Sequence, residues 1–513
     1  MDKNFYITTP IYYPSAKPHM GHAYSSIIAD FFARFKLIDN YNVHFLTGTD
    51  EHGLKIQRSA EEAGKEPQKF CDDISKIFKD LSKILNLSNT DFIRTTENRH
   101  KKSVQYLWNV LEKNNDIYLS NYSGWYSVSD EAFYNDDEIE ELNGKKVASI
   151  SKSPVEWIEE ESYFFRLSKW EKPLLEYYDS NPDFISPPSR KNEVISFVKS
   201  GLKDLSISRK SFSWGIPVPN NKKHVIYVWL DALTNYLSAL NYPELNDDLY
   251  EKFWPASIHL IGKDILRFHS VYWPAFLLAA KIPLPKKVYG HGWILSGDEK
   301  MSKSKGNILD PIEIIEKYGL DPLRYYLIKE VSFGNDGNIS KERLEDCINS
   351  DLANNYGNLC QRVTSFAFKN CDGKIPSNIQ FQSADLEILN KYSENLENIR
   401  SKIDEQNINY YIDYIVNSLF EANKYFNDQE PWSKKDDKLR LDTIIYTALE
   451  IIRKISFLLY PIIPETSLKA IKIFDLSEKD IKLVSISNNE YLKKGNGLTK
   501  IDILFKKIEK KND

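Results

Sequence analysis

Apolar positions in the first hundred residues alternate between short runs typical of buried strands and longer stretches with helical spacing. Residues 5–13 are apolar, β-branched and aromatic, and the apolar spacing over 23–35 predicts a helix after a proline-containing break. A second buried strand is predicted at 43–46, and an amphipathic helix over 70–85. Strands that alternate with helices predict an α/β fold with a mostly parallel sheet.

The hydrophobic pattern changes twice further along the chain. Short aromatic and polar segments fill residues 116–225 and predict an insertion domain, after which the α/β pattern resumes in the apolar runs 225–229 and 258–262. Beyond about residue 344 the spacing is persistently helical, with apolar stripes through 344–366 and 441–459. The C-terminal third is therefore predicted to be a helical bundle.

Composition narrows the class of protein without deciding its partners. With 513 residues, 42% hydrophobic and 27% charged, the chain is expected to form two to four globular domains. A net charge of -5 does not exclude RNA, which needs only a local basic surface. Four scattered cysteines, no signal peptide and no long apolar run predict a cytoplasmic protein with free thiols.

A short motif, His19-Met20-Gly21-His22, stands where the loop after the first strand enters a helix. The N–H groups and dipole of a helix N-terminus favour a phosphate, and two imidazoles add hydrogen-bond donors. Gly21 has no Cβ, so a nucleotide could approach the backbone closely. Alone, the motif fits a surface loop with two histidines equally well.

A second motif, Lys300-Met301-Ser302-Lys303-Ser304, forms a basic loop suited to a leaving pyrophosphate. A solvated basic loop is its alternative interpretation. The order of the two motifs, with a helical C-terminal region after them, resembles class I aminoacyl-tRNA synthetases. Further segments resemble the methionine-specific branch of that class; they are residues 9–13, 48–53, 229–232, 261–264 and 268–270.

The resemblance implies a Rossmann-like parallel-sheet catalytic domain, interrupted by a connective insertion and followed by an all-α anticodon-binding bundle. The expected segments are 1–116 for the first catalytic half, 117–226 for the insertion, 227–292 for the second half, 293–345 for the K-M-S-K-S loop and stem-contact region, and 346–513 for the anticodon-binding domain.

The implied activity is ATP-dependent ligation of methionine to tRNA(Met) through methionyl-adenylate, with release of AMP and pyrophosphate and with Mg²⁺ on the phosphates. Neither step needs a protein nucleophile, so catalysis is expected from positioning and charge stabilisation. By resemblance, His19 and His22 would contact the ATP phosphates, Gly21 would admit the adenosine, and Lys300 and Lys303 would close over pyrophosphate.

The resemblance also assigns four positions around the nucleotide and one that is linked to the active site. Gly262 and Asp264 match ribose-contacting positions, and the backbone at Trp293 and Ile294 is a candidate adenine site. Arg209 matches a position linked to the active site, with a surface salt bridge as its alternative role.

Methionine recognition is assigned to a strand end and an apolar pocket. Asp50 follows a strand and would anchor the α-ammonium group, with a helix cap as the alternative. Tyr236 and His269 can approach sulfur, a weak acceptor. Leu233 stands where some relatives have proline. Homocysteine should compete, because one methylene gives only about 1–3 kcal/mol of discrimination. The matching pocket positions are Ile11, Tyr13, Trp229, Ala232, Leu233, Tyr236, Ile265, His269 and Trp273.

Anticodon reading is assigned to the bundle. Asn358 and Arg362 are four residues apart and share a helix face. Trp432 lies in a polar segment, where an exposed indole could stack on an unpaired base. For a lone tryptophan, a plug at the end of the bundle would be the preferred interpretation, but all three positions match anticodon readers in the family.

The chain departs from many relatives in its insertion and at its end. Ser127 and Asp130 stand where the paired cysteines of a zinc knuckle would lie, so no structural zinc is expected. The sequence ends at Asp513, soon after the bundle, which favours a monomer and a tRNA affinity that falls steeply with salt.

Three alternatives remain open at this point. A class I synthetase for another apolar amino acid is the nearest. A small nucleotidyltransferase with an H-x-G-H loop is disfavoured by the insertion and the bundle. A catalytically silent tRNA-binding protein is disfavoured by intact His19, His22, Lys300 and Lys303.

Overall fold

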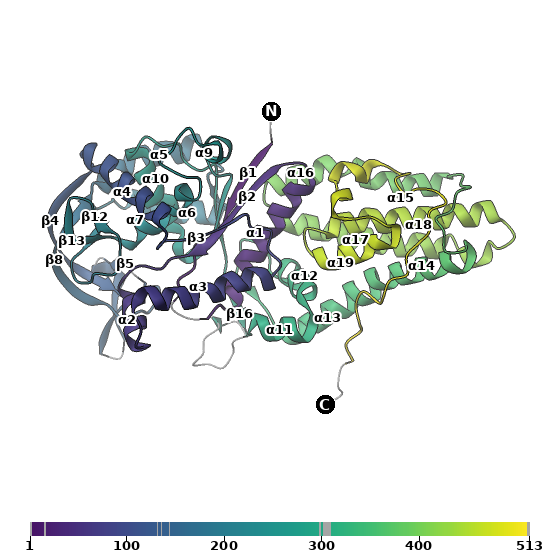
Figure 1. Ribbon diagram of the computed structural model, residues 1–513, viewed down its shortest axis with the longest axis horizontal. Coiled ribbons are helices and arrows are strands. Elements are labelled where there is room, and N and C mark those ends of the chain that lie inside the picture. Colours follow the sequence, from purple (N-terminus) through teal and green to yellow (C-terminus); the bar gives the residue numbers. More distant parts are fainter. Residues whose placement is uncertain are drawn as a thin grey trace. The chain divides into compact units, whose positions relative to one another are not determined.

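The computed structural model describes residues 3–14, 17–130, 132–134, 136–142, 144–296, 299–300 and 309–509 (Figure 1). Contacts divide the chain into two compact units that are interleaved in sequence. One comprises Met1–Lys3, His19–Asn42 and Gly292–Asp513, and the other comprises Asn4–Pro18 and Val43–His291.

The second of these units, the sheet unit, is built on a six-stranded sheet of order β3-β2-β1-β14-β15-β9. The pairs β1–β14, β14–β15, β15–β9 and β2–β3 are parallel, as the sequence predicted. Since β1 and β14 are neighbours, their carboxyl ends meet at one edge, where α/β sheets bind ligands. The strands are β1 (Asn4–Thr8), β2 (Asn42–Thr49), β3 (Asp91–Arg94), β9 (Ile185–Ser186), β14 (Ile258–Gly262) and β15 (Val288–His291).

Amphipathic helices cover this sheet. In α4, Val104, Leu107 and Trp108 are fully buried in the main core, because residues three and four apart share a face. The helices of the unit are α2 (Leu54–Glu62), α3 (Pro67–Ile84), α4 (Asn98–Lys113), α5 (Glu171–Ser180), α6 (Pro188–Lys199), α7 (Val228–Leu233), α8 (Asn235–Ser238), α9 (Asp248–Phe253), the π-helix η4 (Phe268–Tyr272) and α10 (Trp273–Ala279).

The predicted insertion contains antiparallel sheets, as its change of texture suggested. A four-stranded sheet has the order β10-β8-β4-β5, a three-stranded sheet has the order β11-β13-β12, and β6 pairs with β7. Their strands are β4 (Ile117–Ser127), β5 (Ala132–Tyr134), β6 (Ile139–Leu142), β7 (Lys145–Ala148), β8 (Glu156–Phe165), β10 (Leu205–Ser206), β11 (Ser208–Arg209), β12 (Pro217–Val218) and β13 (Asn221–Ile226).

Two sequence predictions about strands are wrong. The apolar run 225–229 is not a strand of the parallel sheet, because β13 ends at Ile226 and α7 begins at Val228. A short apolar run does not distinguish a buried strand from a buried helix. The first strand ends at Thr8 rather than residue 13, before Pro10.

The other unit, the helical unit, contains α1 and the C-terminal bundle (Figure 1). A buried ion pair and a hydrogen bond connect α1 to its neighbours: Asp30 contacts Arg324 of α12 at 2.6 Å, and Arg34 donates to the Tyr460 hydroxyl at 2.8 Å. In α18, the residues from Arg440 to Leu459 are buried, as the predicted stripe required.

The described elements of the helical unit include α1 (Met20–Ile38), β16 (Ile294–Ser296), β17 (Glu299–Lys300), α11 (Pro311–Tyr318), α12 (Leu320–Glu330), β18 (Gly337–Asn338), α13 (Lys341–Cys347), the π-helix η6 (Ile348–Gly357), α14 (Asn358–Asn370), α15 (Ser383–Glu394), α16 (Leu396–Asp404), α17 (Ile408–Asp428), the 3-10 helix η7 (Pro431–Ser433), α18 (Lys438–Leu459), α19 (Pro464–Ile471) and the 3-10 helices η8 (Lys472–Phe474), η9 (Glu478–Asp480) and η10 (Leu483–Ser487).

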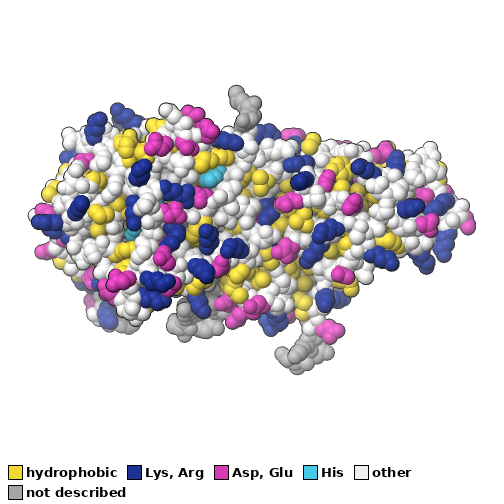
Figure 2. Space-filling model, in the orientation of Figure 1, with side chains coloured by type: hydrophobic (Ala, Val, Ile, Leu, Met, Phe, Trp, Pro, Cys, Tyr) yellow, Lys and Arg dark blue, Asp and Glu magenta, His cyan; other side chains and the backbone are white. Residues whose placement is uncertain are grey.

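The surface charges are mixed. Figure 2 shows Lys and Arg side chains interspersed with Asp and Glu on the face in view, in keeping with the small net charge of -5. Within the described residues, no helix combines the length and apolar composition needed to cross a bilayer. The functional site must therefore be located from individual side chains rather than from bulk charge.

Candidate functional site

Aromatic rings from α7, α8, η4 and α10 converge in the sheet unit. The rings of Trp229 and Phe268 stack with centroids 3.6 Å apart and planes 4° from parallel. Tyr236 lies 5.7 Å from His269 and 6.2 Å from Trp273, which is fully buried. The Trp229 ring also meets His269 edge-on at 6.3 Å, so ring contacts connect four of the predicted pocket residues. Ala232 and Leu233, both buried, extend α7 beside Trp229.

Tyr236 and His269 are joined by a hydrogen bond of 2.7 Å between Oη and Nε2. The other ring nitrogen, Nδ1, lies 3.0 Å from the carbonyl of the predicted pocket residue Ile265. Burial lowers the pKa of His269 to about 4, although this carbonyl and Asp264 act in the opposite direction. The ring is therefore neutral near pH 7, with its proton on Nδ1, because a carbonyl can only accept.

Asp50 follows β2 and is 3% exposed. Its backbone N–H donates to the Tyr12 carbonyl at 2.9 Å, and the Tyr12 N–H donates to the Gly48 carbonyl. These two hydrogen bonds hold the loop after β1 against the end of β2. Burial raises the pKa of Tyr236, and the nearby Asp50 carboxylate acts in the same direction, although hydrogen bonds with Asn235 and Thr8 oppose the change.

The loop after β1 also carries two predicted pocket residues, one on each side of Tyr12. Ile11 and Tyr13 are half-buried and pack against the same core cluster as Trp229 and Tyr236. The structure thus gathers four of the predicted methionine residues in one aromatic cluster, and Ile11 and Tyr13 pack against the hydrophobic core of the same unit.

A buried His-Asp-His arrangement supports this cluster and was not predicted from the sequence. Asp231 accepts from His52 Nδ1 and His100 Nε2, each at 2.7 Å. Burial opposes ionisation of Asp231, but the two histidines more than compensate, and its pKa lies below the usual value. Because Asp231 lies in α7 and His52 follows Asp50, this contact joins two pocket segments. His52 and Asp231 lie in family-like motifs, the one signal that could have identified them.

Gly262 is the last residue of β14, and the space beside it leaves no room for a Cβ atom. A Cβ added there would lie 2.6 Å from Oδ1 of Asp264, so a larger residue would displace that carboxylate. Asp264 itself is exposed. Both predicted ribose positions are therefore neighbours at the carboxyl end of a central strand.

His19 and His22 cap α1 with their side chains. His19 Nδ1 accepts from the Gly21 N–H at 3.1 Å, and His22 Nδ1 accepts from the His19 N–H at 3.0 Å. Their rings lie 3.8 Å apart. A Cβ on Gly21 would lie 3.0 Å from the His19 ring, which explains the glycine. Burial, and then the proximity of His19, hold the pKa of His22 well below its usual range.

This geometry changes one expectation from the sequence. Two of the helix-terminal N–H groups offered to a phosphate are donated to the imidazoles instead. Since each Nδ1 accepts, the proton of each neutral ring lies on Nε2. Any imidazole N–H that these two neutral rings could offer to a phosphate is therefore on Nε2.

The predicted adenine positions lie at β16. The Trp293 N–H donates to the Asp336 carboxylate and its carbonyl accepts from Gly337, both at 2.9 Å, and buried Ile294 pairs with Gly337. The backbone of Trp293 is thus already engaged.

The basic loop begins beside this strand, because Lys300 in β17 pairs with Leu295 of β16. Lys303 lies outside the described residues, in the segment 301–308.

Arg209 is 1% exposed, so the alternative of a surface salt bridge is wrong. Its guanidinium donates to Ser206 Oγ at 2.9 Å and to the Ser208 carbonyl, and lies over the Tyr227 ring at 4.8 Å. Its carboxylate neighbour, Glu160, is 3.8 Å away.

The predicted anticodon residues lie in the helical unit. Asn358 begins α14, and Arg362 on the same helix donates to Asn427 Oδ1 at 2.7 Å. Arg362 lies over the Phe426 ring at 5.5 Å, and Trp432 meets the same ring edge-on at 6.5 Å. Trp432 is 46% exposed, so it does not plug the bundle.

Comparison with known proteins places both units in one family. Residues 5–364 match the family model described as tRNA synthetases class I (M), and residues 375–513 match the anticodon binding domain of methionyl tRNA ligase. The chain belongs to the class I methionyl-tRNA synthetases. The activity predicted from the sequence, ATP-dependent ligation of methionine to tRNA, is therefore confirmed, as is the fold class.

Individual relatives of the methionyl-tRNA synthetase family are similar over nearly the whole chain. The methionine–tRNA ligase of Brucella melitensis is 49% identical, covering 92% of both chains, and that of Rickettsia felis is 48% identical, covering 99% of both. The structure of Mycobacterium tuberculosis methionyl-tRNA synthetase with methionyl-adenylate has a TM-score of 0.95 at 44% identity, covering 98% of this chain and 99% of that one.

The insertion of this methionyl-tRNA synthetase family member contains a carboxylate-centred cluster at the knuckle position. Asp130 accepts from Tyr134 at 2.7 Å, from Ser151 at 2.5 Å and from Ser153 at 2.7 Å, while its N–H donates to Ser127 at 3.3 Å. Hydrogen bonds thus join β4, β5 and the turn near residue 151. Among the described residues, no group of three or more His, Cys, Asp or Glu could hold a metal ion.

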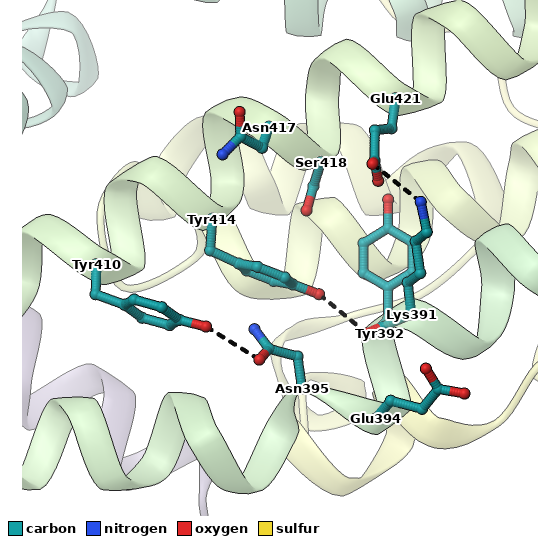
Figure 3. A pocket seen from close by; sticks show the side chains of 9 residues that line it. All are labelled: Lys391, Tyr392, Glu394, Asn395, Tyr410, Tyr414, Asn417, Ser418 and Glu421. Atoms are coloured by element: carbon teal, nitrogen blue, oxygen red, sulfur yellow. Dashed lines mark hydrogen bonds and ion pairs between the residues drawn. The ribbon is translucent and has the colours of Figure 1, made fainter.

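The bundle also has a groove of about 380 Å³ lined by α15, Asn395 and α17 (Figure 3). Its lining includes Tyr410, which donates to Asn395, and Lys391, which pairs with Glu421 at 3.0 Å. One lysine stands against two glutamates in this lining, so the groove does not suit RNA phosphate. None of the predicted anticodon residues lines it.

Proposed function

We propose that methionine binds in the aromatic cluster, with its ammonium group on Asp50 and its thioether among Trp229, Tyr236 and His269. Burial of Asp50 at the end of β2 supports this role, because a carboxylate removed from bulk water attracts an ammonium group more strongly than an exposed one does. The other pocket positions would shape the wall; they are Ile11, Tyr13, Ala232, Leu233, Ile265 and Trp273.

We propose further that the methionine carboxylate attacks the α-phosphate of ATP, forming methionyl-adenylate and releasing pyrophosphate. His19 and His22 would donate from Nε2 to phosphate oxygens, and Lys300 and Lys303 would neutralise the departing pyrophosphate. The observation that carries this proposal is that each ring accepts a backbone N–H through Nδ1, so the proton of each neutral ring lies on Nε2. The Mycobacterium tuberculosis relative was solved with methionyl-adenylate, the same intermediate.

Five residues would position the nucleotide. Gly262 and Asp264 are proposed to contact the ribose, and Trp293 and Ile294 to border the adenine. Buried Arg209, held by two serines, would support the site electrostatically.

Mg²⁺ would enter with the ATP phosphates. Such ions keep several waters and need only one or two carboxylates besides phosphate oxygens, so a dedicated protein cage is unnecessary. The ion would neutralise charge on the phosphates, and no structural zinc is proposed.

In the second step, a ribose hydroxyl of tRNA would attack the acyl carbon and release AMP.

Asn358, Arg362 and Trp432 are proposed to read the anticodon. Half-exposed Trp432 offers a stacking face, and Arg362 offers donors beside it. We also propose a cytoplasmic monomer with the five segments 1–116, 117–226, 227–292, 293–345 and 346–513; four free cysteines suit a reducing compartment.

Lys303→Ala tests the catalytic assignment. Single-turnover adenylate formation should slow by about 100-fold or more while methionine binding stays near normal, because the lysine acts on developing charge. Unchanged adenylation would remove the loop from the mechanism.

Pyrophosphate exchange with a panel of amino acids tests the substrate: dependence on leucine or isoleucine instead of methionine would contradict the pocket assignment.

Trp432→Ala tests the anticodon assignment. Its tRNA charging should fall while methionine-dependent pyrophosphate exchange is unchanged, since the second reaction needs no tRNA. Normal charging together with normal exchange would exclude Trp432 from anticodon reading.

A further inference from the structure

Phe420 of α17 is 66% exposed, more than any other aromatic side chain among the exposed large hydrophobic residues of the described chain. A single exposed apolar residue is common on protein surfaces, so exposure alone indicates no site. The polar side chains beside Phe420 on the bundle provide the further evidence for a binding site.

Two polar contacts lie on the same side of α17. Asn423 and Asn427 follow Phe420 by three and seven residues, so the three side chains share a helix face. Asn427 accepts from Arg362 at 2.7 Å, and Asn423 Nδ2 donates to Asn355 Oδ1 at 2.6 Å. We call these two contacts and Phe420 the amide strip; it runs between α17 and the continuous segment η6–α14.

The partner of Asn423 lies in unusual backbone. Asn355 belongs to η6, a π-helix of ten residues that leads directly into α14. Wide helical turns of this kind are rare and are often found at functional sites. Asn355 and Arg362 both contact α17, through Asn423 and Asn427, so both lie on the side of this segment that meets α17.

The Asn355–Asn423 pair presents hydrogen-bonding groups that match a base edge. Asn423 uses its amide N–H groups on Asn355 and on the Leu419 carbonyl, which leaves its Oδ1 as an acceptor. Asn355 accepts through Oδ1 and retains its NH₂ as a donor. A neighbouring donor and acceptor can pair with the edge of an unstacked nucleobase, while an aromatic face stacks on its ring.

The spacing separates this pair from the predicted anticodon readers. Phe420 and Asn427 are seven residues apart, or about 10 Å along the helix axis. Stacked bases are about 3.4 Å apart, so the two ends of the strip would meet different bases of one loop. Exposed Lys424, four residues after Phe420, adds a positive charge for the backbone.

We propose that Phe420 and the Asn355–Asn423 pair form a second nucleobase subsite, which binds another unpaired base of the same tRNA loop that Arg362 and Trp432 read. The inference rests on the proposed anticodon surface and extends it by one base. Phe420 supplies the stacking face, and the two amides select the base edge.

Binding of an anticodon stem–loop RNA to the full chain tests this subsite. Phe420→Ala should weaken binding by about 5- to 150-fold, the range for loss of one base–aromatic stack. Phe420→Tyr should retain affinity, whereas Phe420→Leu should not, since an apolar side chain without a ring cannot stack. Val484→Ala is the matched control, because Val484 is 59% exposed and lies outside the strip.

Abasic substitutions in the RNA identify the base. Removing the base that stacks on Phe420 should weaken binding to the unchanged protein but add nothing to the loss in Phe420→Ala. Additive losses at every loop position would overturn the subsite. Methionine-dependent pyrophosphate exchange should be normal in all variants, which verifies that they are folded.

Two outcomes separate this inference from the proposal beneath it. Normal binding by Phe420→Ala with weakened binding by Trp432→Ala would overturn the second subsite and leave the anticodon surface intact. Normal binding by both variants would overturn the anticodon surface as well.

Discussion

The hydroxyl of Tyr236 donates to Nε2 of His269 at 2.7 Å, because the Nδ1 proton of that ring is committed to the Ile265 carbonyl. In this arrangement the hydrogen atoms of both side chains are used within the protein. The sequence suggested that these two residues could approach the sulfur of methionine as polar partners. Their mutual bond leaves packing, rather than a hydrogen bond, as the main interaction with sulfur.

Norleucine tests this consequence, since it replaces the sulfur of methionine with a methylene of similar size. We expect its kcat/KM in pyrophosphate exchange to fall by about tenfold or less, because an apolar pocket rejects an isostere weakly. Rejection by several thousandfold would mean that a donor reaches the sulfur, and that the Tyr236–His269 bond opens when methionine binds.

Tyr236→Phe should remove the partner of Nε2 and leave a buried acceptor unsatisfied. The free energy of unfolding should fall by about 1–3 kcal/mol, the usual cost of such a group. Denaturant unfolding measures it, and Tyr178→Phe is a control, since that buried hydroxyl also bonds a single acceptor, the Ser270 carbonyl, and Tyr178 is not itself a proposed methionine contact. Only Tyr236→Phe should also raise KM for methionine; equal effects on KM would contradict the assignment.

Acid should destabilise the protein through its buried histidines. The pKa of His269 is about 4 in the folded chain and 6.5 ordinarily, so the unfolded chain binds more protons between these values. Stability from this group is therefore complete above about pH 6.5 and is lost as pH falls toward 4, by about 3 kcal/mol.

His269→Gln isolates the contribution of this residue to acid destabilisation. Burial also lowers the pKa of His44 to about 4, so some acid sensitivity should remain in the variant. Unfolding free energies of parent and variant between pH 4 and 7 measure the difference, and parallel curves would contradict it.

Two substitutions at His22 distinguish the roles of its two ring nitrogens. Asparagine can imitate Nδ1, which accepts from the His19 N–H, whereas glutamine can place an amide donor near Nε2. We expect His22→Asn to retain the cap but lose about 100- to 1,000-fold in adenylation rate, the cost of one donor to developing charge. His22→Gln should keep more activity but lose about 1 kcal/mol of cap energy. The opposite ranking in single-turnover assays would assign catalysis to Nδ1.

Short-range patterns predicted more of this molecule than its long-range contacts. The strand and helix periods of residues 43–46 and 70–85 depend on neighbours in sequence, and the structure has β2 and α3 there. By contrast, Asp231 meets histidines 179 and 131 residues away, which no local pattern reveals. The exposure of single side chains could not be predicted from the sequence either. Arg209 and Trp432 each had two interpretations, and the choice between them required the burial of Arg209 and the exposure of Trp432.

The Asp130 cluster predicts how the insertion responds to metal removal. Three hydroxyls donate to this carboxylate, so the turn is held without a cation, and a chelator should leave the melting temperature unchanged. Asp130→Ala should lower the free energy of unfolding by about 1–3 kcal/mol, because three hydroxyls lose a charged acceptor. Ser153→Ala removes one donor and should cost less. A chelator-induced fall in melting temperature, restored by zinc, would contradict the proposal that hydrogen bonds stabilise the insertion in place of a metal ion.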